Sequence, residues 1–90
     1  SAHYWLGEIY LLKKEYREAA LILAEGFQKY PKSIKAPEIL YKLSESLLKI
    51  EKVKDACSTM EKFVKEYPKH KLLKKISQKK LEYKCNKLLE

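Results

Sequence analysis

The stretch Tyr4-Trp5-Leu6-Gly7-Glu8 decides the fold, because a similar stretch follows 37 residues later as Tyr41-Lys42-Leu43-Ser44-Glu45. The same spacing relates Glu18-Ala19 to Asp55-Ala56, and Tyr30-Pro31-Lys32 to Tyr67-Pro68-Lys69. A fixed period of roughly 20 to 50 residues is typical of stacked repeat units. Such units bury their apolar faces only by stacking, and the stack presents an extended concave surface. The pattern therefore predicts a module that binds another molecule rather than an enzyme.

Apolar residues recur with helical spacing in five segments, at about residues 2–14, 16–30, 37–50, 53–67 and 71–89. Pro31 and Pro68 end helices, because proline lacks an amide donor and clashes with the preceding turn. Pro37 suits the first turn of the next helix. In the last segment, lysine fills most positions between sparse apolar residues, as expected of a terminal helix with one face in water. We therefore predict an all-α fold of stacked helical hairpins, with five helices and a basic C-terminal capping helix.

The composition fits one small globular domain of 90 residues, with 46% hydrophobic and 36% charged residues. No apolar run approaches the roughly 20 residues that span a bilayer. The chain has neither an initiating Met nor a signal peptide. We expect it to be a piece of a longer protein, with any targeting signal outside it.

The net charge of +8 is concentrated in residues 69–90, which hold eight lysines and two glutamates. One interpretation is that this Lys-rich segment binds nucleic acid or another polyanion, with strong salt dependence. Aromatic residues that stack on bases are limited there to Tyr83. We therefore keep polyanion binding as the alternative, and the leading interpretation includes no nucleic acid.

Two series of positions resemble the tetratricopeptide repeat, whose usual period is about 34 residues. The first comprises His3, Leu6, Gly7, Tyr10, Ala19, Leu23, Gly26 and Pro31, and the second comprises Leu40, Leu43, Ser44, Leu47, Ala56, Met60, Phe63 and Pro68. This resemblance implies a right-handed superhelix in which Gly7 faces Ala19 and Ser44 faces Ala56. It divides the chain into a first repeat (1–33), a second repeat (34–70) and a capping helix (71–90).

Two longer blocks narrow the resemblance. Residues 2–10 (Ala-His-Tyr-Trp-Leu-Gly-Glu-Ile-Tyr), followed by Tyr30-Pro31-Lys32-Ser33 and Lys35-Ala36-Pro37-Glu38, resemble the C-terminal repeat domain of the YbgF (CpoB) family of the Tol-Pal system. The resemblance implies a periplasmic, non-enzymatic scaffold without cofactors, in a Gram-negative bacterium. Its partners would be TolA and the peptidoglycan synthesis machinery, which the adaptor coordinates with outer-membrane constriction during cell division. It also implies a full-length trimer, formed by an N-terminal coiled coil that this chain lacks.

The exposed positions of each first helix line the concave groove in tetratricopeptide stacks. Carried onto this sequence, the resemblance predicts a partner-binding groove of Tyr4, Glu8, Leu12, Glu38, Tyr41, Lys42, Glu45, Lys49, Lys75, Gln78, Lys79 and Glu82. Tyrosine rings give contact area, and charges set the register of a bound peptide. The other interpretation is that the tyrosines shield neighbouring helices and that the charges form a solvated face.

The remaining reactive residues are two cysteines and two histidines. Cys57 and Cys85 lie at an offset of about four residues, or ~6 Å, in an antiparallel helix pair, and a disulfide needs Cα atoms within about 7 Å. Spacing alone thus allows a disulfide or two buried thiols. The resemblance favours the disulfide, because some YbgF-like proteins have a cysteine in each of these helices. We expect His3 to pack in the core and His70 to lie in a loop or helix start, and neither stands at metal-ligand or catalytic spacing.

Overall fold

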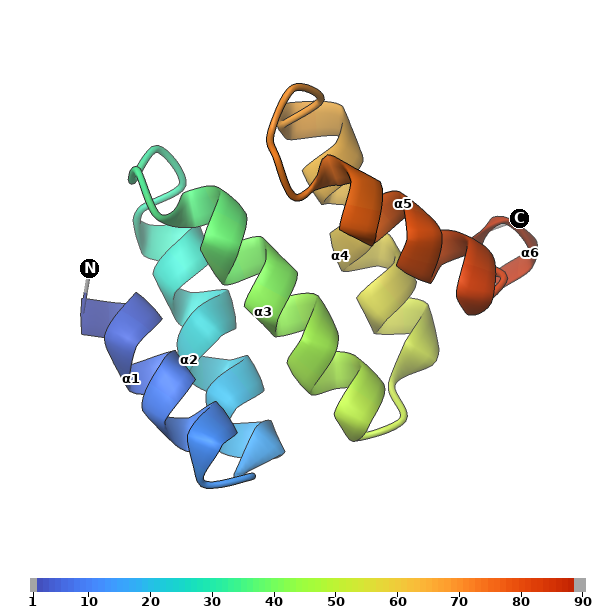
Figure 1. The fold of residues 1–90 in the computed structure, drawn as a ribbon. Coiled ribbons are helices and arrows are strands. Elements are labelled where there is room, and N and C mark those ends of the chain that lie inside the picture. The colour runs from blue at the N-terminus through green and yellow to red at the C-terminus, as the bar shows by residue number, and fades with distance from the viewer. Residues whose placement is uncertain (1, 89–90) are drawn as a thin grey trace.

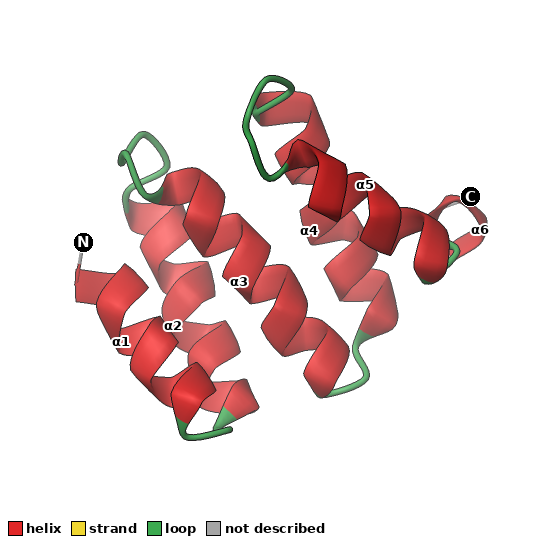
Figure 2. Ribbon diagram, viewed as in Figure 1, coloured by secondary structure: helices red, strands yellow, loops and turns green. Residues whose placement is uncertain are grey.

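The computed structural model describes residues 2–88, which contain six helices and no strand (Figures 1 and 2). The helices are α1 (Ala2–Leu12), α2 (Tyr16–Lys29), α3 (Ala36–Lys49), α4 (Val53–Glu66), α5 (Leu73–Glu82) and α6 (Cys85–Leu88). Each helix packs against the next in the chain, and α1 also contacts α3. The predicted all-α fold of stacked helical hairpins is confirmed. No helix in the described part is long and apolar enough to cross a membrane.

The turn inside each hairpin has the same unusual backbone. Lys14, Glu51 and Lys84 have φ angles of 61°, 63° and 55°, in the left-handed region that non-glycine residues seldom adopt. Glu51 follows Lys14 by 37 residues, whereas Lys84 follows Glu51 by only 33. The helix before Lys84, α5, has 10 residues where α3 has 14, so the third hairpin begins with a helix one turn shorter.

The loops between hairpins also repeat. In the first loop, the Lys35 amide donates to Ser33 Oγ at 3.2 Å, and in the second the Leu72 amide donates to His70 Nδ1 at 3.0 Å. Ser33 and His70 are therefore equivalent loop residues with unlike side chains. His70 lies before α5 in the second loop, as the sequence predicts.

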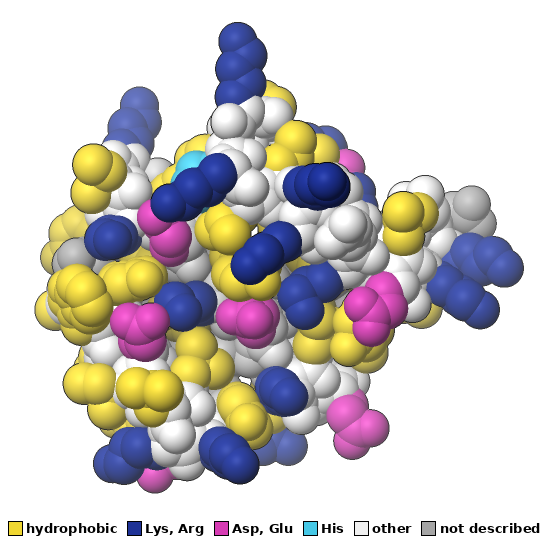
Figure 3. All heavy atoms as spheres, in the orientation of Figure 1, with side chains coloured by type: hydrophobic (Ala, Val, Ile, Leu, Met, Phe, Trp, Pro, Cys, Tyr) yellow, Lys and Arg dark blue, Asp and Glu magenta, His cyan; other side chains and the backbone are white. Residues whose placement is uncertain are grey.

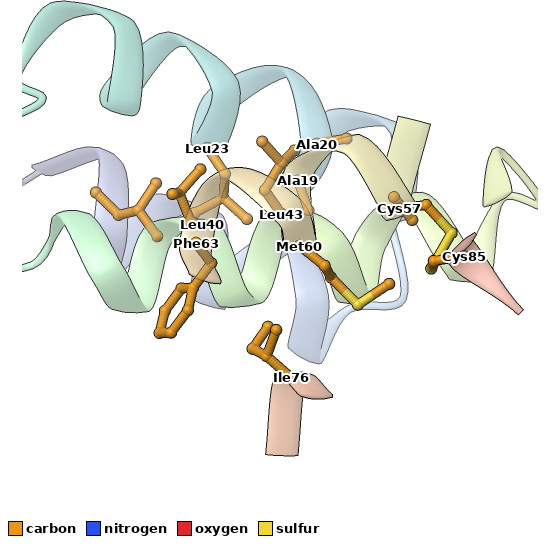
Figure 4. Packing of buried hydrophobic residues seen from close by; sticks show 12 residues of the cluster. Ala19, Ala20, Leu23, Leu40, Leu43, Cys57, Met60, Phe63, Ile76 and Cys85 are labelled. Atoms are coloured by element: carbon orange, nitrogen blue, oxygen red, sulfur yellow. A yellow bond between two sulfur atoms is a disulfide. The ribbon is translucent and has the colours of Figure 1, made fainter. Parts of the chain in front are cut away.

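Residues 71–89 differ from the single helix that the sequence predicts. Within the described range the segment is two helices, α5 and α6, separated by Tyr83 and Lys84. The break lets α6 fold back toward α4, which it contacts. There Cys85 forms a disulfide with Cys57, with a Cα–Cα distance of 5.3 Å (Figure 4). Both cysteines are fully buried. The favoured disulfide is thus present, and a reversal of chain direction allows it.

The core runs through α2, α3 and α4 and ends at α5 and α6 (Figure 4). Its largest fully buried apolar side chains are Leu23, Ile39, Met60, Phe63 and Ile76. Ser44 and Ser46 are buried among them and donate hydrogen bonds to backbone carbonyls of α3, at 2.6 and 2.9 Å. Their hydroxyls therefore carry little desolvation penalty.

Gly7 has a nearest neighbour other than the Ala19 that the resemblance implies. A Cβ built on Gly7 would lie 2.4 Å from Leu23 Cδ2, and its three nearest atoms all belong to Leu23. Gly7 therefore makes room for Leu23, not for Ala19. The residues 37 positions later are Ser44 and Met60, a larger hydroxyl residue and an unbranched thioether that bends more easily than leucine.

His3 and Gly26 are an unusual pair, in which the large side chain at position 3 fills the space beside the glycine at position 26. A Cβ built on Gly26 would lie 2.5 Å from His3 Cβ, so the imidazole occupies the space that a side chain at 26 would need. The equivalent residues 37 positions later are Leu40 and Phe63, both buried. His3 is half-buried, and its Nε2 lies 3.0 Å from Glu25 Oε1. It packs as predicted, at the edge of the core.

Candidate functional site

The face formed by α1, α3 and α5 carries two adjoining hollows. The first, of about 280 Å³, is lined by Glu8, Leu11, Leu12, Tyr16, Lys42, Glu45 and Lys49. The second, of about 140 Å³, is lined by Glu45, Leu48, Lys49, Lys79 and Tyr83. Since Glu45 and Lys49 line both, the two form one shallow groove, called here the α3 groove. In Figure 3 the face toward the viewer, over α1, α3 and α5, has acidic and basic side chains side by side with apolar ones.

The α3 groove lies at the hairpin-turn end of the molecule. Leu12 is the last residue of α1, Lys49 is the last of α3, and Tyr83 directly follows α5. Tyr16 begins α2 and lines the same hollow as Leu12. The first helices therefore supply the groove with their last turns, and the hairpin turns hold those ends in place.

One ion pair crosses the groove from α1 to α3. Lys42 Nζ lies 3.1 Å from Glu8 Oε1, and both side chains are about a quarter exposed. Lys49 Nζ lies 6.0 Å from the centre of the Tyr16 ring, at the outer limit of a cation–π contact. Five of the predicted groove residues thus line one hollow: Glu8, Leu12, Lys42, Glu45 and Lys49.

Tyr4 lies outside both hollows. Its ring meets Trp5 edge-on at a centroid distance of 5.0 Å, and Lys35 Nζ lies 4.8 Å from the ring centre. Lys42 Nζ is 5.9 Å from the same ring. The ring is half-buried and packs against the core cluster. Tyr4 therefore extends the aromatic and cationic surface of α1 beyond the groove.

Glu38 and Tyr41 are more enclosed than the prediction requires. Glu38 Oε1 lies 3.9 Å from His70 Nε2, and it has no hydrogen-bond partner among the described residues. Tyr41 packs against the core, and this burial is the main reason that its pKa is raised. Neither Glu38 nor Tyr41 lines either of the two hollows. The tyrosine is thus closer to the interpretation in which aromatic rings shield neighbouring helices.

On α5, only Lys79 of the four predicted residues lines the groove. Lys75, Gln78 and Glu82 are exposed on the same helix but belong to neither hollow. Next to Lys79, Lys80 is engaged elsewhere, because its Nζ lies 2.5 Å from Glu61 Oε2 on α4. Lys79 and Lys80 are therefore adjacent in the sequence but lie in different environments.

The sequence prediction missed four lining residues: Leu11, Tyr16, Leu48 and Tyr83. Tyr16 and Tyr83 lie at the start of a second helix and in a turn, outside the first-helix positions from which the prediction was carried over. Their common signal is a large side chain within four residues of a hairpin turn.

A larger hollow of about 600 Å³ lies between the start of α1 and the loop that joins α2 to α3. It is lined by Ala2, His3 and residues 29–33. It touches neither α3 nor α5, so it does not belong to the surface that the hairpins share. Within residues 2–88, no group of three or more His, Cys, Asp or Glu side chains is placed to hold a metal ion.

Comparison with known proteins gives one family. Residues 1–63 of the 90 match the family model described as anaphase-promoting complex, cyclosome, subunit 3, whose repeats are of the tetratricopeptide type. No curated protein and no solved structure matches the chain.

Proposed function

Because the chain belongs to the family described as anaphase-promoting complex, cyclosome, subunit 3, we propose that it is a non-enzymatic adaptor that holds a segment of a protein partner in the α3 groove. Tetratricopeptide-type repeats are protein-interaction modules, and their stacks present extended surfaces. The observation that carries the proposal is the pair of adjoining hollows on α1, α3 and α5.

The chemistry of the groove suits a peptide better than a small metabolite. The hollows are shallow and mix apolar walls with charges of both signs. Apolar and aromatic walls supply contact area, and charges around them fix register and orientation. Such a surface fits a segment that is extended or helical and several residues long.

The finer proposal names the partner as TolA. It is supported by the resemblance of the Trp5–Glu8 and Tyr30–Pro37 blocks to the YbgF family. The Cys57–Cys85 disulfide is compatible with an oxidising compartment such as the periplasm. In this proposal the adaptor links Tol-Pal-driven constriction of the outer membrane to peptidoglycan synthesis.

The test is a titration of the isotope-labelled chain with soluble TolA at about 0.15 M salt. We expect amide shifts to concentrate on α1, α3 and α5, and Glu45→Ala with Lys49→Ala to weaken binding at least about fivefold. The matched control is Lys54→Ala with Asp55→Ala, which removes one charge of each sign from exposed positions on α4.

Three outcomes test the adaptor function, the TolA partner and the groove separately. Shifts confined to the groove with TolA support both the adaptor and its partner. Absence of TolA binding overturns the partner. Binding that the groove variant and the control weaken equally overturns the groove. Titration with a random oligonucleotide tests polyanion binding. Binding to the oligonucleotide and not to TolA would favour the alternative in which the Lys-rich segment binds a polyanion.

A further inference from the structure

The border between the two hollows holds three charged side chains that form no ion pair among residues 2–88. Glu45 and Lys49 line both hollows, and Lys79 lines the second. Among residues 2–88, none of these three forms an ion pair, whereas Lys42 and Glu8 pair with each other. Lys79 is partly buried, and no carboxylate among residues 2–88 pairs with it.

The charge left at this border is positive. Glu8 offsets Lys42, and Glu45 offsets one of the two remaining lysines, which leaves a balance of one positive charge. Lys49 comes from α3 and Lys79 from α5, so the two approach the border from different helices. An acidic side chain placed there would gain from both lysines.

The walls on either side of this border are apolar. Leu11, Leu12 and Tyr16 line the first hollow, and Leu48 and Tyr83 line the second. Leu12 is 80% exposed, which is a large fraction for a leucine beside a hollow. The first hollow has about twice the volume of the second, so it would take the larger side chain.

We propose that the α3 groove binds a protein segment in which one acidic side chain lies between two apolar ones, the larger apolar side chain entering the hollow beside Leu12. The acidic group lies between Lys49 and Lys79, and the apolar groups fill the two hollows. This inference rests on the proposed function and adds the chemical class of the bound segment.

A polyanion does not fit the same surface. Glu8 and Glu45 line the groove, and a continuous row of phosphates would meet both carboxylates. Like charges in close contact disfavour the complex. A single carboxylate meets less repulsion, because Lys49 and Lys79 outnumber Glu45 at the border and Glu8 is already paired with Lys42.

The test uses four capped synthetic peptides of equal length, with glycine and serine flanks. Their varied residues are Phe-Ser-Glu-Ser-Val, Phe-Ser-Gln-Ser-Val, Phe-Ser-Lys-Ser-Val and Ser-Ser-Glu-Ser-Ser, because alternate residues of an extended segment face the same side. We measure affinity by calorimetry and locate the site by amide shifts, at protein concentrations where sedimentation shows a monomer. The acidic apolar peptide should bind about tenfold more tightly than its lysine counterpart, because two lysines attract one and repel the other.

Charge reversal provides the matched variants. Lys79→Glu should remove the preference for the acidic peptide, and Lys49→Glu with Lys79→Glu should reverse it in favour of the lysine peptide. Lys74→Glu is the control, since it makes the same change at an exposed position of α5 that lines neither hollow. Circular dichroism checks that all variants remain helical.

The outcomes separate this inference from the function on which it rests. Equal affinity for the acidic, neutral and lysine peptides would overturn the charge preference, and groove-localised shifts would still support the adaptor. Binding of Ser-Ser-Glu-Ser-Ser as tight as that of Phe-Ser-Glu-Ser-Val would overturn the apolar part. Failure of all four peptides, with TolA still bound at the groove, would overturn the inference alone.

Discussion

Removal of the Cys57–Cys85 disulfide tests how the last hairpin is held on the stack. The bond joins residues 28 positions apart and closes a loop that contains the end of α4 and all of α5. Chain entropy for a loop of this length corresponds to about 3.5 kcal/mol at 25 °C. For a domain of this size that is a large part of the usual total of about 5–15 kcal/mol.

The structure indicates where the loss appears. α6 has four residues and is anchored through buried Cys85, so it should detach first when the bond is cut. α5 keeps two other anchors, the fully buried Ile76 and the ion pair between Lys80 and Glu61. Amide exchange should therefore accelerate most in α6, less in α5 and least in α2 and α3.

The assay is urea unfolding of the oxidised and reduced wild-type chain, followed by circular dichroism. We expect reduction to lower the free energy of unfolding by about 2–4 kcal/mol. A Cys57→Ala/Cys85→Ala variant should lose somewhat more, because it also removes sulfur atoms from two fully buried positions. A reduced chain within about 1 kcal/mol of the oxidised one would refute the reasoning, since the folded contacts alone would then hold α6.

Three further changes test the packing and the turns. Gly7→Ala should destabilise the fold by about 1–3 kcal/mol in urea unfolding, because the new Cβ would meet the side chain of Leu23 at 2.4 Å; an unchanged midpoint would contradict this packing. The hydrogen bond from Lys80 is the main cause that lowers the pKa of Glu61 from its ordinary value of 4.5. The pair therefore stabilises the fold above pH 4.5, and this stabilisation is lost as the pH falls through the lowered pKa of Glu61. In Lys80→Met the free energy of unfolding should therefore decline less between about pH 6 and pH 3 than in the wild type. The difference should be less than about 1 kcal/mol, because the Glu61 side chain is 36% exposed. A decline as steep as that of the wild type would count against a stabilising role of the pair. Glu51→Gly should raise the thermal midpoint by about 2–6 °C, because it relieves a φ of 63° at a residue whose side chain forms no ion pair among residues 2–88; a lower midpoint would show that the left-handed backbone costs little at this residue.

The repeat at 37 residues was enough to predict the two complete hairpins. Apolar spacing placed their helices within a few residues of the observed bounds, and Pro31 and Pro68 marked the loops. The third hairpin could not be predicted in the same way. Apolar residues continue through its turn, and Lys84 adopts the left-handed region without the glycine that usually signals it. The turn therefore has no local signature.

The candidate groove was predicted in part, for a different physical reason. Helical periodicity identifies which residues share the face of a helix, and this placed Glu8, Lys42, Glu45 and Lys49 together. It does not show how deeply neighbouring helices cover each position. Tyr41 was predicted to be open, but it packs against the core, whereas Tyr16 reaches the groove from the start of α2.

Comparison of the two complete hairpins distinguishes residues whose identity is constrained by packing from residues whose identity is not. Gly7 makes room for Leu23, and the residues 37 positions later are Ser44 and Met60, so a larger residue in place of the glycine accompanies a more flexible one in place of the leucine. A substitution in such a pair alters the fold before it alters binding.

Glu45, Lys49 and Lys79 do not belong to the core cluster or pack against it. They line hollows, form no ion pair within residues 2–88, and lie outside the buried core. The stack does not need their charges to form, so these positions can be reversed in sign while the helices stay in place. This independence is what makes a binding change at these three residues attributable to the partner, because the same substitution in a packed pair would lower stability and affinity together.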